Sequence, residues 1–108
     1  MNGVQSVRTP LQSWPSSSGR RLRIDLYLHR IRLVKSRTLA QALIGTGYVR
    51  IDGKRIEKPS EQVDVGSVIA LPLSGRVRVL KVRSLPWRRG PAREARSHYE
   101  EVEPEPGN

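Results

Sequence analysis

The spacing of apolar residues changes in the middle of the chain, and this change limits the possible folds more than any other feature. Between residues 24 and 44, apolar side chains recur every three or four positions, as on one face of an α-helix. After Gly47 they alternate with polar residues, as in a strand that buries one face. The sequence therefore predicts an α+β domain in which two packed helices precede a small antiparallel sheet.

The first helix is expected to begin near Arg23. Ile24, Leu28 and Ile31 should share one face of it, because residues four and seven positions apart lie on the same side. Asp25 would lie in the first turn, where the partial positive charge of the helix N-terminus favours a carboxylate. We assign Asp25 this structural role and no catalytic one.

The second helix is predicted to start after Ser36, whose hydroxyl can accept a hydrogen bond from a free backbone N–H of the first turn. Gly45 and Gly47 are expected to adopt left-handed conformations that end the helix and turn the chain. The buried stripe of this helix should consist of Leu39, Ala40, Leu43 and Ile44.

A hairpin is predicted after the helices. Val49 and Ile51 should face one side of its first strand, and Asp52-Gly53 is a strong signal for a type I′ turn. Residues 54–56 would then return antiparallel to the first strand.

Two further strands are predicted around the Ser74-Gly75 turn, at residues 68–73 and 76–85. The apolar phase of the second changes between Val79 and Leu80, which predicts a β-bulge there. A short helix is expected to start with Pro91 as its first residue. It would dock on the sheet through Ala92, Ala95, Tyr99 and Val102.

The chain of 108 residues fits one domain flanked by extensions. Residues 1–20, rich in Ser, Pro and Gly, are predicted to form a disordered tail. Residues 21–85 should form the domain itself. Residues 86–108 are interpreted as a C-terminal extension with a short helix and an acidic end.

The chain carries a large excess of positive charge. Twenty Lys and Arg residues against ten Asp and Glu residues give a formal net charge of +10, which favours a polyanionic partner, nucleic acid before a membrane surface. The sequence has neither an apolar run of about 18 residues nor the apolar core of a signal peptide. We therefore expect a soluble, cytoplasmic protein that does not associate with membranes.

Residues for enzymatic or metal chemistry are sparse. The chain has no cysteine, and its two histidines, His29 and His98, are expected to be separate, exposed helix residues. No nucleophile–base set and no phosphate-binding glycine loop can be assembled. We therefore predict no catalytic residues, no metal site, no cofactor and no enzymatic activity.

Basic residues gather at the junction of the two predicted helices and along the predicted hairpin. The junction also offers a helix N-terminus, whose free N–H groups and dipole attract anions. Arg32, Lys35 and Arg37 should form the centre of a phosphate-contacting patch. The complete set of predicted binding residues is Arg23, Arg30, Arg32, Lys35, Ser36, Arg37, Arg50, Lys54, Arg55 and Lys58.

Residues 23–63 resemble the S4 (S-four) RNA-binding domain, the family named after a ribosomal protein of the small subunit. Five motifs carry the resemblance: Arg23-Ile24-Asp25, Ser36-Arg37, Gly47-Tyr48-Val49, Asp52-Gly53 and Lys58-Pro59-Ser60. The later segment "RRGPAREARSHYEE" is similar to one that follows the domain in the branch of ribosome-associated fifteen-kilodalton heat-shock proteins.

The resemblance implies an S4-like fold and an RNA-binding protein that recognises structured ribosomal RNA by its shape and phosphates. The heat-shock branch further implies a stress-response role, in which the protein associates with the large ribosomal subunit; we expect the protein itself to be a monomer. On that subunit it would help to rescue complexes in which a nascent chain is stalled on peptidyl-tRNA.

Two alternatives stay open for the function: an RNA-binding relative of an RNA-modifying enzyme such as a pseudouridine synthase, and a protein that binds DNA and RNA without specificity. Two interpretations also stay open for Tyr27 and Tyr48. Either tyrosine could stack on a base, but packing against the small core is the favoured interpretation for both.

Overall fold

The computed structural model describes residues 20–102 of the chain. The predicted N-terminal tail, apart from its last residue, and the acidic residues 103–108 lie outside the described residues. The helices are α1 (Ile24–Arg30), α2 (Arg37–Gly45) and α3 (Ala92–Arg96). The strands are β1 (Leu22–Arg23), β2 (Val49–Ile51), β3 (Lys54–Ile56), β4 (Gln62–Val63), β5 (Val68–Leu73), β6 (Arg76–Val82) and β7 (Tyr99–Val102).

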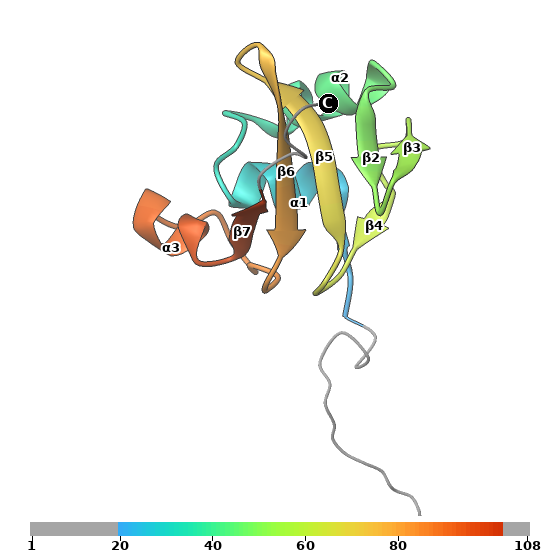
Figure 1. The fold of residues 1–108 in the computed structure, drawn as a ribbon. Coiled ribbons are helices and arrows are strands. Elements are labelled where there is room, and N and C mark those ends of the chain that lie inside the picture. The colour runs from blue at the N-terminus through green and yellow to red at the C-terminus, as the bar shows by residue number, and fades with distance from the viewer. Residues whose placement is uncertain (1–19, 103–108) are drawn as a thin grey trace, which may run out of the picture.

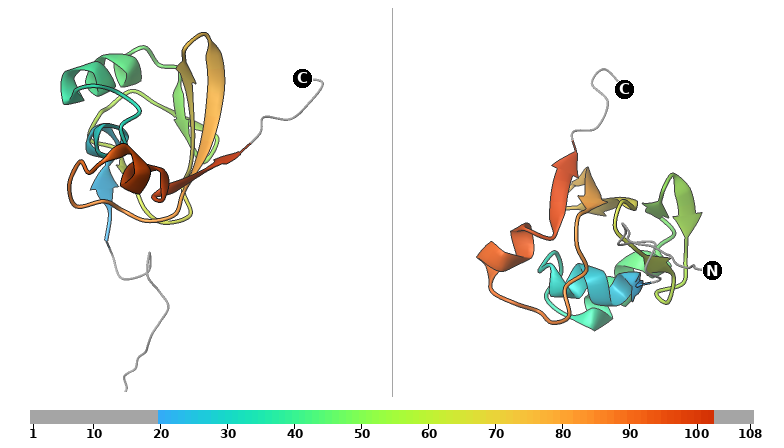
Figure 2. Two further views of the ribbon diagram at one scale, coloured as in Figure 1. Left: turned by 90° about the vertical axis from the view of Figure 1, so that its left-hand side faces the viewer. Right: turned by 90° about the horizontal axis from the view of Figure 1, so that it is seen from below.

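The strands form two antiparallel sheets. The larger sheet has five strands in the order β3-β2-β5-β6-β7, and the smaller one pairs β1 with β4. Helices α1 and α2 lie together on one face of the larger sheet, whereas α3 lies beside β7 (Figures 1 and 2). The predicted α+β arrangement of two packed helices, a small antiparallel sheet and a short C-terminal helix is confirmed.

The core lies between the two helices and the inner face of the larger sheet. Because side chains alternate along a strand, each strand contributes every second residue to it. From the helices, Ile24, Leu28 and Ile44 are fully buried in this core. The strands contribute Val49, Ile56, Ile69, Leu71, Leu80 and Val82 to the same cluster.

The prediction for the helical stripes is confirmed for α1 and partly wrong for α2. Ile31 is buried together with Ile24 and Leu28 of α1, as expected. In α2, Ala40 and Ile44 are buried and Leu43 is partly buried, but Leu39 is 51% exposed. Leu39 lies about 100° around the helix from Ala40, outside the narrow stripe that faces the core.

The predictions for Gly45 and Gly47 have different outcomes. Gly47 adopts a left-handed conformation with a φ of 85°, as predicted. Gly45 does not, because it is the last residue of α2, and one left-handed glycine suffices to turn the chain. The predicted type I′ turn is confirmed by the positive φ values of Asp52 (53°) and Gly53 (81°).

The predicted β-bulge near residues 79–80 is wrong. Strands β5 and β6 pair without interruption from Val68 opposite Lys81 to Leu73 opposite Arg76. The change of apolar phase has another cause, because β6 carries apolar residues on both faces. Leu80 and Val82 point into the core, whereas Val77 is 57% exposed on the outer face.

The C-terminal part differs from the single docked helix that the sequence suggested. Helix α3 ends at Arg96, and Tyr99–Val102 form strand β7, which pairs with β6 at the edge of the sheet. Tyr99 and Val102 therefore share no helical face with Ala95, which is buried. Pro91 is the N-cap residue, one position before the predicted one. Within residues 20–102, no helix has both the length and the apolar character needed to cross a bilayer.

Candidate nucleic-acid interface

A buried carboxylate organises the basic residues at the start of both helices. Asp25 is fully buried, and its carboxylate accepts hydrogen bonds from Arg23 (2.9 and 3.1 Å), Gln41 (3.0 Å) and the backbone N–H of Leu26 (2.8 Å). Arg37 Nη2 lies 3.5 Å from the same carboxylate. Burial raises the pKa of Asp25, but these hydrogen bonds lower it more, so that its pKa is below the usual value.

The pairing with Asp25 leaves both arginine side chains accessible. Those of Arg23 and Arg37 are 40% and 46% exposed, whereas the aspartate side chain is 0% exposed. Each guanidinium carries five N–H donors, and only some of them face the carboxylate. Asp25 therefore fixes the position of the two cations without occupying all of their hydrogen-bonding capacity.

The connection between α1 and α2 is held against the segment that precedes α3. Arg30 Nη1 donates to the backbone carbonyl of Pro86 at 3.0 Å, and Arg32 Nε donates to that of Gly90 at 2.6 Å. In the opposite direction, Arg89 donates to the carbonyls of His29 (3.0 Å) and Val34 (3.4 Å). Arg30 and Arg32 thus have a structural role in addition to the predicted one.

Lys35 and Ser36 lie between these two groups of contacts. The side chain of Lys35 is exposed and makes no hydrogen bond or ion pair to any residue between 20 and 102. Ser36 is the N-cap of α2, and its hydroxyl accepts the Leu39 N–H at 3.1 Å, as predicted. The junction therefore combines a capped helix N-terminus with an exposed ammonium group.

The imidazole of His29 lies close to the positive charges of this junction. Partial burial is the largest cause that lowers its pKa, and the nearby charges of Arg89, Arg37, Arg30 and Arg32 lower it further. Arg32, in the connection after α1, has a left-handed backbone conformation with a φ of 66°. We call these four arginines, together with Lys35 just before α2, the junction patch.

Arg89 was missed by the sequence analysis, which placed it in the C-terminal extension. Its local sequence, a basic run before Gly90 and Pro91, indicates positive charge but not which part of the fold it contacts. Only the folding of residues 86–90 back onto the α1–α2 connection brings Arg89 into the junction patch.

The second group of predicted residues lies on the hairpin. Arg50, Lys54, Arg55 and Lys58 are all exposed. Arg50 lies directly opposite Arg55 in the β2–β3 pair, and Arg55 forms a long, exposed ion pair of 3.8 Å with Glu57. In Figure 1 the α1–α2 connection lies to the left of the central strands β5 and β6, and the hairpin lies to their right. The fold therefore does not bring the basic residues of the connection and those of the hairpin into one cluster.

The two tyrosines have different environments. Tyr27 is fully buried and its hydroxyl donates to the backbone carbonyl of His98 at 2.9 Å, which confirms the core interpretation for this residue. The same interpretation is wrong for Tyr48, which is 73% exposed. Its neighbour Val49 points into the core, and alternation along the strand directs Tyr48 outward.

A second exposed aromatic residue was missed. Trp87 is 75% exposed, and the guanidinium carbon of Arg88 lies 5.3 Å from the centroid of its ring. The sequence offers no signal for this exposure, because a tryptophan is as readily buried as exposed. Trp87 lies in the segment that residues of the junction patch bind, so an aromatic surface adjoins that patch.

The prediction that both histidines are exposed helix residues is wrong. His29 belongs to the last turn of α1 but is partly buried. His98 lies between α3 and β7, and its Nδ1 is 2.6 Å from the hydroxyl oxygen of Ser84. Among the described residues, no three His, Asp or Glu side chains come together as a possible metal site.

Comparison with known proteins gives consistent results. The S4 domain model matches residues 22–69. The small ribosomal subunit protein uS4 of Listeria welshimeri is 41% identical over 49 residues, which cover 45% of this chain and 24% of that protein. The corresponding protein of Lacticaseibacillus casei is 43% identical over the same length. The chain therefore matches about a quarter of the length of these relatives.

The structural match is longer. The trimeric structure of heat shock protein 15 from Vibrio cholerae superposes with a TM-score of 0.72 and 30% sequence identity. The match covers 77% of this chain and 83% of the Vibrio chain, and thus extends beyond the S4 domain itself. The chain belongs to the S4-domain family.

Proposed function

We propose that this protein binds structured ribosomal RNA, chiefly through the junction patch. The observation that carries the proposal is the gathering of four arginines, Arg30, Arg32, Arg37 and Arg89, around the α1–α2 connection and the start of α2. Such a surface attracts phosphates by charge and can hold them by the arginine forks. Arg50, Lys54, Arg55 and Lys58 extend the contact along the hairpin, and Arg23 contributes from beside Asp25.

A pair of double variants tests this surface. Lys35→Ala/Arg37→Ala should weaken binding to ribosomal RNA and reduce the slope of log affinity against log salt by up to about two units. Arg93→Ala/Arg96→Ala, on the exposed side of α3, removes the same charge and serves as the control. If both pairs weaken binding equally, net charge rather than the junction patch governs binding and the proposal is wrong.

The finer proposal concerns the ribosome. We infer that the protein acts in the cytoplasm, associates with the large subunit and takes part in the rescue of stalled nascent-chain complexes. Its similarity to heat shock protein 15 supports this assignment, and its similarity to uS4 makes the small subunit the alternative. Sucrose-gradient sedimentation of tagged protein from stressed cells separates the two, and free protein at the top of the gradient contradicts both.

Three further alternatives have direct tests. Pseudouridine formation on ribosomal RNA by the purified protein would support the enzymatic alternative, whereas we expect none. Equal affinity for duplex DNA and ribosomal RNA at matched salt would support non-specific binding. For the oligomeric state we expect a monomer, and the trimer described for the Vibrio protein is the alternative that sedimentation equilibrium would reveal.

A further inference from the structure

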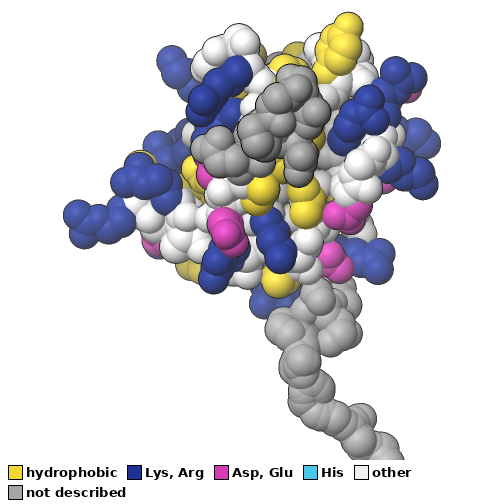
Figure 3. Space-filling model, viewed as in Figure 1, with side chains coloured by type: hydrophobic (Ala, Val, Ile, Leu, Met, Phe, Trp, Pro, Cys, Tyr) yellow, Lys and Arg dark blue, Asp and Glu magenta, His cyan; other side chains and the backbone are white. Residues whose placement is uncertain are grey.

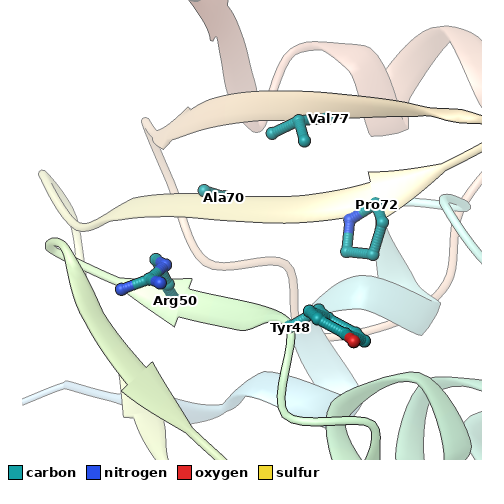
Figure 4. A pocket seen from close by; sticks show the side chains of 5 residues that line it. All are labelled: Tyr48, Arg50, Ala70, Pro72 and Val77. Atoms are coloured by element: carbon teal, nitrogen blue, oxygen red, sulfur yellow. The ribbon is translucent and has the colours of Figure 1, made fainter.

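The outer face of the larger sheet contains a groove that the junction patch does not include. Its volume is about 430 Å³, within the range of roughly 300–1,000 Å³ typical of small-ligand pockets. The groove lies over β2, β5 and β6 (Figure 4), on the side of the sheet opposite α1 and α2. Its lining residues are Tyr48, Arg50, Ala70, Pro72 and Val77.

The register of the strands explains how these side chains meet. Arg50 pairs with Ala70, and Pro72 pairs with Val77, so all four lie on the outer face in neighbouring rows. Tyr48 precedes the strand by one residue and lies on the same side as Arg50. The result is an apolar floor on β5 and β6, with an aromatic ring and a guanidinium at one side.

The charge beside this floor points to an anionic ligand. Arg50 and Arg55 lie directly opposite each other on β2 and β3, an arrangement that is destabilising for like charges. Only the long, exposed pair with Glu57 offsets Arg55 among the described residues. Figure 3 shows further Lys and Arg side chains on the β2–β3 side of this face, next to hydrophobic side chains over the central strands.

We propose that the groove binds an unpaired RNA base, which stacks on Tyr48 while Arg50 contacts an adjoining phosphate. A nucleotide combines a flat apolar base with a negative charge, and the groove combines an apolar floor and an aromatic ring with a cation. Stacking on an aromatic side chain is a general means of holding unpaired bases. This proposal rests on the proposed RNA binding and adds single-stranded segments to the duplex phosphates as its targets.

The test compares two RNA probes of equal length, a hairpin with an unpaired loop and a blunt duplex of the same composition. Tyr48→Ala should weaken binding to the hairpin by roughly tenfold and leave duplex binding unchanged. Tyr48→Phe keeps the ring and should bind both probes like the original protein. Arg50→Ala should lower the salt dependence of hairpin binding more than Lys81→Ala does, a change at an exposed lysine outside the groove.

The outcomes separate this inference from the proposed function. If Tyr48→Ala leaves hairpin binding unchanged while Lys35→Ala/Arg37→Ala weakens binding to both probes, the groove proposal is wrong and the proposed function stands. If the original protein binds neither probe, both are wrong. If Tyr48→Ala instead dissociates an oligomer in sedimentation equilibrium, the groove is an interface between copies of the chain and the proposal is likewise wrong.

Discussion

The guanidinium of Arg37, the first residue of α2, lies 3.5 Å from the buried carboxylate of Asp25 in the first turn of α1. The two helices are therefore joined at the point where the basic surface begins. Arg23 and Gln41 bind the same carboxylate. One acidic residue therefore fixes both the packing of the two helices and the positions of Arg23 and Arg37, which are predicted to contact phosphates.

Replacement of Asp25 by Asn should destabilise the protein at neutral pH by roughly 1.5–3 kcal/mol, because charge-assisted hydrogen bonds to a buried group are lost. The folded-state pKa of Asp25 is lowered, so its contribution to stability is present above the unfolded-state pKa near 3.8 and is lost as the pH falls through the folded-state pKa. Chemical denaturation between pH 7 and pH 2 should show the difference between the two proteins shrinking below about pH 4. A difference that is constant with pH would contradict this role.

Two substitutions by alanine in α2 should have very different effects on stability. Ile44→Ala removes a fully buried side chain and should reduce the free energy of unfolding by about 2–5 kcal/mol. Leu39→Ala removes one that is 51% exposed and should cost less than about 1 kcal/mol. Thermal unfolding of both variants checks the orientation of the helix, and equal losses would show that α2 is rotated.

The left-handed conformation of Arg32 gives a prediction about the α1–α2 connection. Both Arg32→Ala and Arg32→Gly remove the hydrogen bond to Gly90, but only glycine adopts a φ of 66° without strain. The glycine variant should therefore be more stable than the alanine variant by about 1 kcal/mol. Denaturant unfolding measures this difference, and an alanine variant that is the more stable one would contradict the conformation of the connection.

RNA binding should raise the pKa of His29. In the free protein partial burial lowers this pKa most and the junction arginines lower it further, and phosphates bound at the patch would offset the arginine charges. Binding is then coupled to proton uptake, so the affinity should increase as the pH falls through the region of the histidine pKa. NMR titration of the imidazole with and without RNA tests this directly, and His29→Gln should abolish that part of the pH dependence. An unchanged pKa in the complex would place the phosphates elsewhere.

Local signals in the sequence predicted the secondary structure well at positions where a residue type strongly favours one backbone role, such as a helix cap or a tight turn. Ser36 caps α2 because its hydroxyl meets a free N–H, and Asp52-Gly53 forms the type I′ turn because both residues accept a positive φ. The helical period of Ile24, Leu28 and Ile31 identified the buried face of α1. These outcomes depend on contacts within a few residues along the chain.

Predictions that depended on distant contacts were less accurate. An apolar residue can face the core or the outer surface, and its own neighbours do not decide between them, as Leu39, Tyr48 and Val77 illustrate. The apolar phase in β6 reflected two apolar faces rather than a bulge. Likewise, the C-terminal pattern could not reveal that Tyr99–Val102 would complete the edge of the sheet.

Local spacing and composition are enough to predict the α+β class, the two helix starts, the hairpin turn and a strongly basic surface. The arrangement of that charge depends on long-range packing. This packing buries Asp25 between Arg23 and Arg37, and it folds Arg89 back onto the junction. Those contacts join residues that are up to 60 positions apart, and such pairings are fixed by packing of the whole core rather than by any local pattern.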